Sequence, residues 1–530
     1  MQRERWITAE GSARGTQCLP MGDLVYVPQC DAPQEQFEAA CEALRHKEWL
    51  FRIIPEKFHA FMRNADLPLW AMDALLQSYV DYRERYQREP GWAKKLDPLL
   101  IAYFRRRYML TDGTDPFALM PTLPFSGIGY AVKEGGLCER TTRTFGLWRL
   151  ANIKQLGFLT DPVVQSSDIQ GAGMTFHHTR YGHSLDVMAV ATLMLSNNQI
   201  SPILRNTLRI AALSHDALTP AGGDTTKLVD RDAFDEDKNF PELLARTDWS
   251  ELHRRYGVLA ATLVDTIQGR GLLGHMLDIA DKVAYVARDA AIYLGRYAPD
   301  GPHAYPVGYY EIKTLVEKNR YVCGIWDAVR VIGKDVVIED AGRLGEFLKL
   351  RALLFRELYY HPGSRFLEHM AAKVIVQYLY DTGALTRDQL LLMTDLELEH
   401  IISGVVGQPY YMSSIGLHGD PRVEVFKSPE DAYVRERELI HEGVVLTLVD
   451  VFTGATNGGL YLSVKKEGKI LSFREAHPHE AAEIENILRP QHPARLYYMP
   501  AGGDDFSEEF LAALASHRQK TLAAQLISSK

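Results

Sequence analysis

The chain has 530 residues, of which 46% are hydrophobic and 24% are charged, and this ordinary balance excludes a wholly disordered protein. A net charge of −9 disfavours a basic nucleic-acid-binding coat but is compatible with a local basic pocket for phosphates. The 5 cysteines form no CxxC pair, so we expect no cysteine-zinc module and a reducing, cytoplasmic location. We also expect no secretory signal and no membrane-spanning segment.

Hydrophobic residues at three- and four-residue spacing predict helices over most of the chain. In chain order, we expect helices over residues 35–110 and then a loop rich in proline, glycine and threonine over 111–142. Residues 143–300 contain several helices with broad apolar faces, and residues 340–400 contain more. Helices of this kind pack into a bundle because each must bury its apolar face.

The pattern changes after about residue 415, where short runs rich in β-branched and aromatic residues predict strands. These runs are 422–427, 443–452, 460–466, 469–473 and 494–500. Glu467-Gly468 lies between two of them and predicts a hairpin turn. Helices are expected in the same region at 479–488 and 511–530.

The candidate chemistry begins with His215-Asp216, which end the apolar helical segment LRIAALSHD. An imidazole and a carboxylate at the buried end of a helix are costly unless both are paired. A divalent metal ion satisfies both, because neutral imidazole nitrogen and carboxylate oxygen are natural ligands. The dipeptide by itself more often marks an ordinary helix end. Other residues of the chain must therefore show whether it belongs to a metal site.

Two further residues extend this pattern. His183 lies in the first turn of an apolar helix, and Asp281 lies on the helix predicted at 275–294. Asp281, Tyr285 and Asp289 recur every four residues and therefore share one helical face. A solvated face is the alternative, but the residues between them leave little room for a wide exposed side: Val283, Ala284, Val286 and Ala287.

The order His…His-Asp…Asp, on separate apolar helices, resembles the metal phosphohydrolases of the HD superfamily. The segments LWRLANIKQLGFL and FHHTRYGHSLDV are similar to the entry segment of its dNTP triphosphohydrolases, the group of the sterile-alpha-motif/HD-domain and bacterial dGTP triphosphohydrolases. Asp281-Lys282-x-x-Tyr285-x-x-Arg288-Asp289 matches as well. The resemblance covers residues 143–300 and continues more weakly to residue 375.

The helical patterns, the strand-rich tail and the resemblance together predict the fold. We expect a mainly α protein, an HD-domain helical bundle with added helices and a small C-terminal α+β domain. Its expected parts are an N-terminal helical region (1–142), the HD phosphohydrolase core (143–300), a helical extension (301–415) and the α+β domain (416–530).

The resemblance also implies roles for individual side chains. The ligands of a divalent metal ion (Mn, Fe, Mg or Zn) would be His183, His215, Asp216 and Asp281. The contacts to a triphosphate would be Arg180, Lys282 and Tyr285, since fixed cations stabilise charge that develops at phosphorus. The contacts to the sugar would be Gln155, Leu156 and Asp289, with Leu156 packing on sugar or base. A homo-oligomer is expected from the same resemblance.

The loop after His215-Asp216 departs from the family pattern, in which a histidine of this loop carries a proton. Thr219 and Asp224 stand where the family has histidines, and Lys227 stands where it has an acid. A general acid or base must then come from other residues of this chain. This departure leaves the activity itself open.

Three candidates for that proton carrier follow. Asp224 is the first candidate, because it stands at the position of a family histidine. A carboxylate near a metal can orient water or receive a proton. His253 is the second candidate. The acidic run Asp235-Glu236-Asp237 is the third, although a solvated loop explains such a run as well. His177 and His178 precede Arg180 and are interpreted as polar loop residues.

The expected reaction is metal-dependent hydrolysis of nucleotide phosphates, in which a dNTP gives deoxynucleoside and triphosphate. The altered loop keeps alternatives open: an HD nucleotide monophosphatase, a phosphodiesterase or nuclease, and a catalytically weak nucleotide-sensing or nucleic-acid-binding protein. Nucleic acid is not the favoured partner because the net charge is negative, and no membrane partner is expected.

Overall fold

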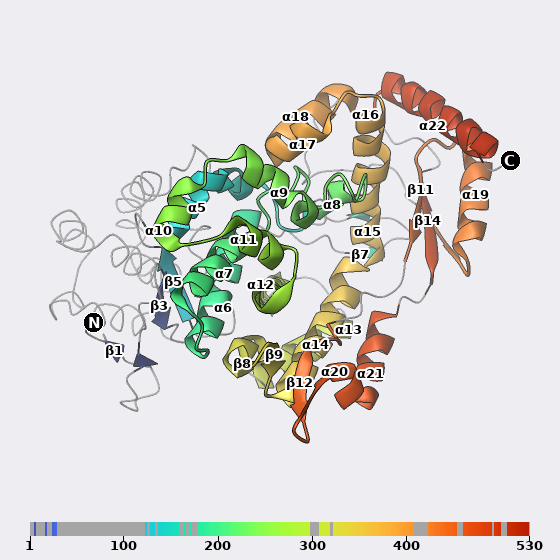
Figure 1. Ribbon diagram of the computed structural model, residues 1–530. Coiled ribbons are helices and arrows are strands. Elements are labelled where there is room, and N and C mark those ends of the chain that lie inside the picture. The colour runs from blue at the N-terminus through green and yellow to red at the C-terminus, as the bar shows by residue number, and fades with distance from the viewer. Residues whose placement is uncertain are drawn as a thin grey trace, which may run out of the picture.

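The computed structural model describes residues 5–6, 16–17, 24–28, 122–123, 128–132, 136–157, 164–165, 170–171, 178–296, 307–318, 322–406, 422–452, 459–489, 492–499 and 506–528. Helices dominate these residues, so the prediction of a mainly α protein is confirmed (Figure 1). The helices predicted at 35–110 lie outside them. Within the described part of the chain, no helix has the length and apolar character needed to cross a membrane.

The centre of the molecule is a group of packed helices: α5 (Leu137–Phe145), α6 (Arg180–Ser196), α7 (Pro202–Ser214), α11 (Ala260–Ile267) and α12 (Gly271–Arg296). Helix α6 packs against both α7 and α12, and α7 also contacts α5 and α11 (Figure 1). Almost every side chain of α6 is buried, as expected of a helix that is hydrophobic around its whole circumference. Its few polar side chains are therefore carried into the interior, where they need partners.

Capping side chains explain where α6 and α7 begin. The Thr179 hydroxyl accepts a hydrogen bond from the Gly182 amide (3.1 Å), and the Ser201 hydroxyl accepts one from the Leu204 amide (3.4 Å). Such caps satisfy amides that have no partner within the helix. The cap at Thr179 thereby fixes the position of His183 near the start of α6.

Short helices connect α7 to α11: α8 (Asp224–Lys227), α9 (Glu236–Arg246) and α10 (Ser250–Tyr256). The acidic run begins α9, where the Asp235 carboxylate accepts a hydrogen bond from the Lys238 amide (2.9 Å). Acidic residues are favourable there because the N-terminal end of a helix is positive. The run is thus a helix start, at which Asp235 and Asp237 are exposed.

The helical part continues beyond α12 as α13 (Val307–Lys318), α14 (Ala341–Leu354), α15 (Pro362–His369), α16 (Gln377–Asp381), α17 (Arg387–Leu392) and α18 (Asp395–Val406). Helix α14 packs against α12 and α13. The π-helical turn η6 (Phe355–Tyr359) follows α14, and such turns frequently occur at functional sites. The side chain of Tyr359 reaches back to α12, as described below.

A three-stranded antiparallel sheet lies in the C-terminal part, with the order β10 (Arg422–Phe426), β14 (Ala494–Tyr498) and β11 (Thr447–Val451). Helix α19 (Pro429–His441) packs against it. The strands predicted in these three segments are confirmed. The helices predicted at the end of the chain are present as α21 (Pro478–Leu488), which packs against α14, and α22 (Glu508–Ser528).

A second sheet has the strand order β13-β12-β9-β8. Its hairpin of β12 (Ser463–Lys466) and β13 (Lys469–Ser472) turns at Glu467-Gly468, as predicted, with φ of 51° and 79° at these two residues. Strand β12 pairs in parallel with β9 (Asp335–Ile338), which pairs with β8 (Val329–Ile332). Segments on both sides of the boundary predicted at 415 therefore share one sheet, while the division into four parts stays a prediction.

The described part of the predicted N-terminal helical region contains strands. β5 (Ile128–Val132) pairs with β3 (Leu24–Pro28) and with β4 (Thr122–Leu123). Two-stranded ladders pair β1 (Arg5–Trp6) with β2 (Thr16–Gln17), and β6 (Val164–Gln165) with β7 (Gln170–Gly171). The loop predicted at 111–142 is wrong for these strands and for α5. This sheet forms because β5 pairs with a segment about a hundred residues away. The composition of 111–142 does not reveal such a partner.

Candidate metal centre and substrate site

Three of the predicted metal ligands come together from three elements. His183 lies near the start of α6, His215 directly follows α7, and Asp281 lies on α12. Asp281 Oδ1 is 2.9 Å from His183 Nε2 and 3.8 Å from His215 Nε2. The two imidazole rings lie edge to face, with centroids 5.5 Å apart. One ligand atom of each residue lies within 4.8 Å of the others, so the three form a compact group.

Asp216, the fourth predicted ligand, lies close to both histidines. Its carboxylate oxygens are 3.7 Å from His215 Nε2 and 3.9 Å from His183 Nε2. The same carboxylate accepts a hydrogen bond from Arg180 Nη1 (3.1 Å). Only 3% of Asp216 is exposed, so its charge depends on these neighbours for compensation. It stands beside the three-residue group, with one oxygen already bound by Arg180.

The geometry of this group fits a divalent cation. His215 Nδ1 lies 2.9 Å from the Ala212 carbonyl oxygen, and donation to it leaves Nε2 with a free lone pair. Ligands about 2.1 Å from one ion lie about 3–4 Å from one another. The distances from the two Nε2 atoms to Asp281 and Asp216 run from 2.9 to 3.9 Å. His183, His215 and Asp281 can therefore bind a metal ion, whose identity their chemistry leaves open.

The carboxylates of the group stabilise positive charge between the histidines. Burial lowers the pKa of His215, but Asp216 and Asp281 outweigh it and raise this pKa to about 9. Burial raises the pKa of Asp281, but His183 and His215 hold it well below its usual value. Protons and metal ions compete for the same imidazole nitrogen. A site whose carboxylates favour a positive charge on the histidines therefore also attracts a divalent cation.

A chain of ion pairs leads from Asp216 to the start of α9. Arg180 binds both Asp216 and Asp224, and Lys227 binds both Asp224 (2.7 Å) and Glu236. The Arg180 side chain is almost completely buried. Arg180, which we predicted to contact a triphosphate, is thus already paired with two carboxylates.

Asp224 is held as a carboxylate. Burial raises its pKa, but Arg180 and Lys227 lower it below the ordinary value. A carboxylate between two cations accepts a proton only against both charges, which makes it a weak base. Its position is that of an ion-pair partner, and its predicted role as proton carrier stays a prediction.

The acidic run offers a different titrating group. Partial desolvation and then the Glu236 carboxylate raise the pKa of Asp237 to about 7. General acid–base catalysis near neutral pH favours such a value. Asp235 caps α9, Glu236 binds Lys227 and Asp237 is exposed, so the predicted role of this run as proton carrier stays a prediction.

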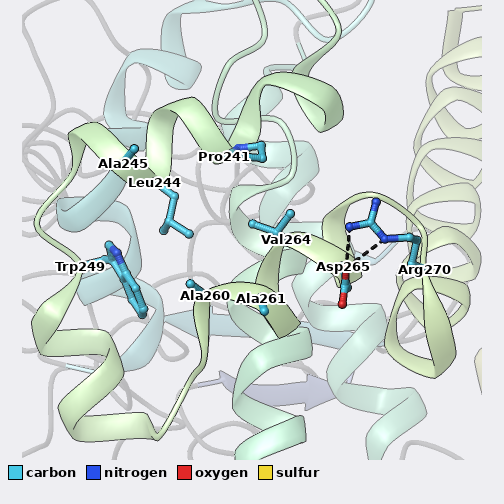
Figure 2. Close-up of a pocket in the computed structure, with 9 residues that line it drawn as sticks. All are labelled: Pro241, Leu244, Ala245, Trp249, Ala260, Ala261, Val264, Asp265 and Arg270. Atoms are coloured by element: carbon cyan, nitrogen blue, oxygen red, sulfur yellow. Dashed lines mark hydrogen bonds and ion pairs between the residues drawn. The ribbon is translucent and has the colours of Figure 1, made fainter.

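His253 is not brought to the metal group. It lies on α10, where its Nδ1 is 2.8 Å from the Val258 carbonyl oxygen and its ring packs against Trp249. Trp249 also lines a mostly apolar pocket of about 520 Å³ between α9 and α11 (Figure 2). The two charged residues of this pocket, Asp265 and Arg270, bind each other. The contacts of His253 thus give no geometric support to its predicted catalytic role.

Lys282 follows Asp281 on α12 but is engaged within the protein. Its ammonium group binds Asp278 and lies over the Tyr461 ring, 5.5 Å from the ring centroid. The Tyr461 hydroxyl donates to the same Asp278 carboxylate (2.6 Å). A phosphate would therefore have to replace Asp278 as the partner of Lys282. Tyr461 brings the C-terminal part of the chain to this side of α12.

Arg351 on α14 is a buried cation that the sequence analysis missed. Its Nε donates to the Tyr285 hydroxyl, and its guanidinium lies over the Phe355 ring, 4.6 Å from the centroid. Its Nη1 is buried and has no hydrogen-bond partner among the described residues. A buried guanidinium with an unused donor is suited to bind phosphate. The signal in the sequence is a lone arginine within the apolar run LRALLF.

Asp289 is fully buried on the same helix as Asp281. One carboxylate oxygen accepts a hydrogen bond from the Tyr359 hydroxyl, and the other, Oδ1, has no partner among the described residues. Burial raises the pKa of Asp289 to about 7. A buried acceptor without a partner is suited to a sugar hydroxyl, the contact predicted for this residue. Tyr359 was not identified from the sequence.

Gln155 and Leu156 are buried beside the start of α6. The Gln155 amide donates to the His178 carbonyl oxygen and the Arg180 amide donates to the Ile153 carbonyl oxygen, both at 2.9 Å. Gln155 Oε1 is another buried acceptor without a partner among the residues that the structure describes. These two residues therefore lie next to the segment that leads into His183.

His178 differs from its interpretation as a polar loop residue. Its side chain is 7% exposed, and its ring centroid is 6.2 Å from that of His183. Burial, followed by the charge of Arg288, lowers its pKa well below the usual value, so the ring is neutral. Packing against α6, which spacing alone does not predict, buries this ring. His177 lies outside the described residues.

No family model and no curated protein matches the sequence. One similar solved structure is a phosphohydrolase from Bacteroides thetaiotaomicron, with 14% sequence identity and a TM-score of 0.48. The match covers 72% of this chain and 99% of that chain.

Proposed function

We propose that this protein is a metal-dependent phosphohydrolase that acts on nucleotide phosphates, with dNTPs as substrates and deoxynucleoside and triphosphate as products. The observation that carries the proposal is the group of His183, His215 and Asp281, with Asp216 beside it. A divalent ion bound there polarises a phosphoryl oxygen and lowers the pKa of water. The resemblance of the motifs around these residues to dNTP triphosphohydrolases supports the choice of substrate.

The buried cation Arg351 and the half-buried cation Lys282 support binding of an anionic substrate. Arg351 has an unused donor, and Lys282 is adjacent to Asp281 in sequence. Fixed cations stabilise the charge that develops at phosphorus during hydrolysis. Arg351 and Lys282 would bind the phosphates, whereas Arg180 would position Asp216.

Buried acceptors support recognition of a sugar. Asp289 Oδ1 and Gln155 Oε1 would accept hydrogen bonds from sugar hydroxyls. A site that is built to bind a hydroxyl rejects analogues that lack it, because its own polar atoms are then left unpaired. A dideoxynucleotide is therefore expected to be a poor substrate.

The test is metal analysis of the purified protein together with a turnover panel of dNTPs, NTPs and NMPs. We expect a bound divalent metal and release of triphosphate from dNTPs. His215→Ala and Asp216→Ala should lose both, because each removes a group that faces the ion. His275→Ala is the matched control, since His275 is exposed on the same helix as Asp281. Undiminished dNTP turnover in Asp216→Ala would contradict the proposal.

A second candidate function is a nucleotide-binding protein with weak catalysis. The observation that favours it is the pairing of Asp224 with both Arg180 and Lys227, which leaves the loop after Asp216 without a free proton carrier. In that case dNTPs would raise the melting temperature of the metal-loaded protein, and the same panel would show no product.

A further inference from the structure

Asp395 lies at the start of α18, and its carboxylate joins two loops of the candidate site. Oδ2 accepts a hydrogen bond from the Lys154 amide (2.7 Å), and Oδ1 accepts one from the Gly222 amide (2.8 Å). Only 4% of Asp395 is exposed. Hydrogen bonds to an ionised acceptor are stronger than neutral ones, so this is a firm connection between residues 154–157 and 217–223.

The two loops also touch each other directly. A Cβ atom on Gly157, which has a φ of +54°, would lie 2.2 Å from the Gly222 carbonyl oxygen. A Cβ atom on Gly223, which has a φ of +59°, would lie 3.2 Å from the Lys154 carbonyl oxygen. Only glycine combines this backbone conformation with so close an approach. Displacement of one loop therefore displaces the other.

The end of α17 and the turn that follows it contact the second loop at further points. The Ala221 amide donates to the Leu390 carbonyl oxygen (2.8 Å). The guanidinium of Arg149 donates to the carbonyl oxygens of Met393 (3.1 Å) and Thr219 (2.6 Å). Residues 390–395 thus fasten the loop to the helical extension.

Both loops lead to the candidate metal centre. The loop at 217–223 connects Asp216 to Asp224, the two carboxylates that bind Arg180. The loop at 154–157 lies beside the entry to α6, which begins with Arg180. We infer that Asp395 is a positioning residue, which keeps the two loops together and thereby holds Arg180 between its carboxylates. The catalytic consequence of this inference rests on the proposed function.

The ionisation of Asp395 makes the connection between the two loops depend on pH. Burial raises the pKa of Asp395 to about 6, although the two amides and Lys154 act to lower it. The charged groups that face it are Lys154, Glu399 and Arg149, which lies on the 3₁₀-helix η3 (Leu147–Asn152). Because this value lies above the ordinary 3.8, the buried, connected arrangement holds the proton more tightly than a solvated Asp395 would. The connection is therefore favoured below about pH 6 and is weakened as the pH rises through that value.

Asp395→Asn is the variant that tests this inference, and Asp388→Asn is its matched control. Asparagine keeps the shape but has only one acceptor oxygen, so it cannot serve both amides. Asp388 lies nearby on α17, with a side chain that is 64% exposed. Hydrogen-exchange protection at Lys154 and Gly222 should fall about tenfold or more in Asp395→Asn and stay unchanged in Asp388→Asn. Unchanged protection in Asp395→Asn would overturn the inference.

Turnover of a dNTP by the metal-loaded protein gives a second readout. Asp395→Asn should lower kcat at pH 8 and should abolish a decline in kcat that the parent shows as the pH rises through about 6, while bound metal stays at the parent level. A purely structural role would lower the melting temperature without changing the pH profile, and that result would overturn the inference. If the parent protein hydrolyses no nucleotide, the proposed function fails, whereas the exchange experiment still decides the inference.

The parent protein supplies the test if Asp395→Asn does not fold. Protection factors at Lys154 and Gly222, which correct for the intrinsic pH dependence of exchange, should rise as the pH passes from 8 to 5. Amides of α6 serve as the internal reference, because this helix is buried in the core. Constant protection of the two loop amides relative to α6 would overturn the inference.

Discussion

Single side chains set the chemistry of the candidate site because a buried charge must be paired. Asp281 faces two imidazoles, and Asp216 faces Arg180. Several polar atoms around them are buried and have no partner within the described part of the chain, among them Gln155 Oε1, Asp289 Oδ1 and Arg351 Nη1. Such atoms can bind a polar ligand without giving up a contact within the protein.

Arg351→Gln should weaken the binding of triphosphates more than that of monophosphates. The variant removes a buried guanidinium whose Nη1 has no protein partner, and loss of a charged hydrogen bond costs roughly 1.5–3 kcal/mol, about tenfold or more in affinity. Calorimetric titration of a dNTP and the matching dNMP measures the difference. Arg343→Gln on the same helix is the control, since Arg343 binds Asp327 instead. An equal loss for both nucleotides would contradict the assignment.

Local elements depend on a few residues at their ends. Thr386 and Gln389 form a capping box that starts α17, and Ser472 and Glu475 form one that starts α20 (Phe473–Ala476). The hairpin of β12 and β13 depends on Glu467-Gly468, where both residues have positive φ. These signals are local in the sequence, so they are visible without a structure.

Gly468→Ala should destabilise the protein by about 1 kcal/mol, because alanine is strained at the φ of 79° that the turn requires. Gly404→Ala is the matched control with the opposite expected sign. Gly404 lies within α18 and a Cβ atom there would meet no neighbour, so alanine should stabilise this helix by about 0.5–1 kcal/mol. Urea unfolding of both variants measures the difference. A destabilised Gly404→Ala together with a neutral Gly468→Ala would contradict this account of the turn.

The whole molecule is joined across its length by contacts that link late segments to earlier ones. Strand β12 pairs with β9, and Tyr461 reaches Lys282 on α12. Arg365 on α15 binds Asp450 on β11 through Nε (3.1 Å) and Nη2 (2.5 Å), and also binds Glu368 (3.1 Å). The C-terminal sheet is thus connected to the helices through buried charges.

Glu368→Gln should stabilise the protein at pH 8 and have little effect at pH 5. Burial, together with Asp450, raises the pKa of Glu368 to about 7, above its ordinary 4.5, although Arg365 acts against this. A raised carboxyl pKa contributes stability that is complete below about pH 4.5 and is lost as the pH rises through 7. Glutamine stays neutral, so it should recover roughly 1–3 kcal/mol at pH 8.

Unfolding at pH 5 and pH 8 measures the effect of Glu368→Gln. Glu509→Gln is the control, because Glu509 is exposed on α22. Equal stabilisation of Glu368→Gln at both values, or a loss at pH 8, would show that the ionised form of Glu368 is well accommodated beside Asp450.

Much of the fold could be predicted because periodicity and turn chemistry are local. The central helices, the C-terminal strands and the turn at Glu467-Gly468 follow from residue spacing. The sheet of β3, β5 and β4 could not be predicted, nor could the parallel pairing of β12 with β9. These pairings join segments that are about a hundred residues apart. The sequence of one strand does not indicate which distant strand it pairs with.

The sequence by itself determined the mainly α character and singled out His183, His215 and Asp281, since each lies on an apolar helix where a polar group needs a partner. Only the tertiary structure decided that these three converge, that His253 lies apart from them, and that Arg180 is paired with two carboxylates. It also revealed Arg351, Tyr359 and Asp395, which come from helices far along the chain. The physical reason is that the spacing of apolar residues along the chain shows which face of a helix is buried. The partner of a buried charge depends instead on which helices pack together, and local spacing does not show this.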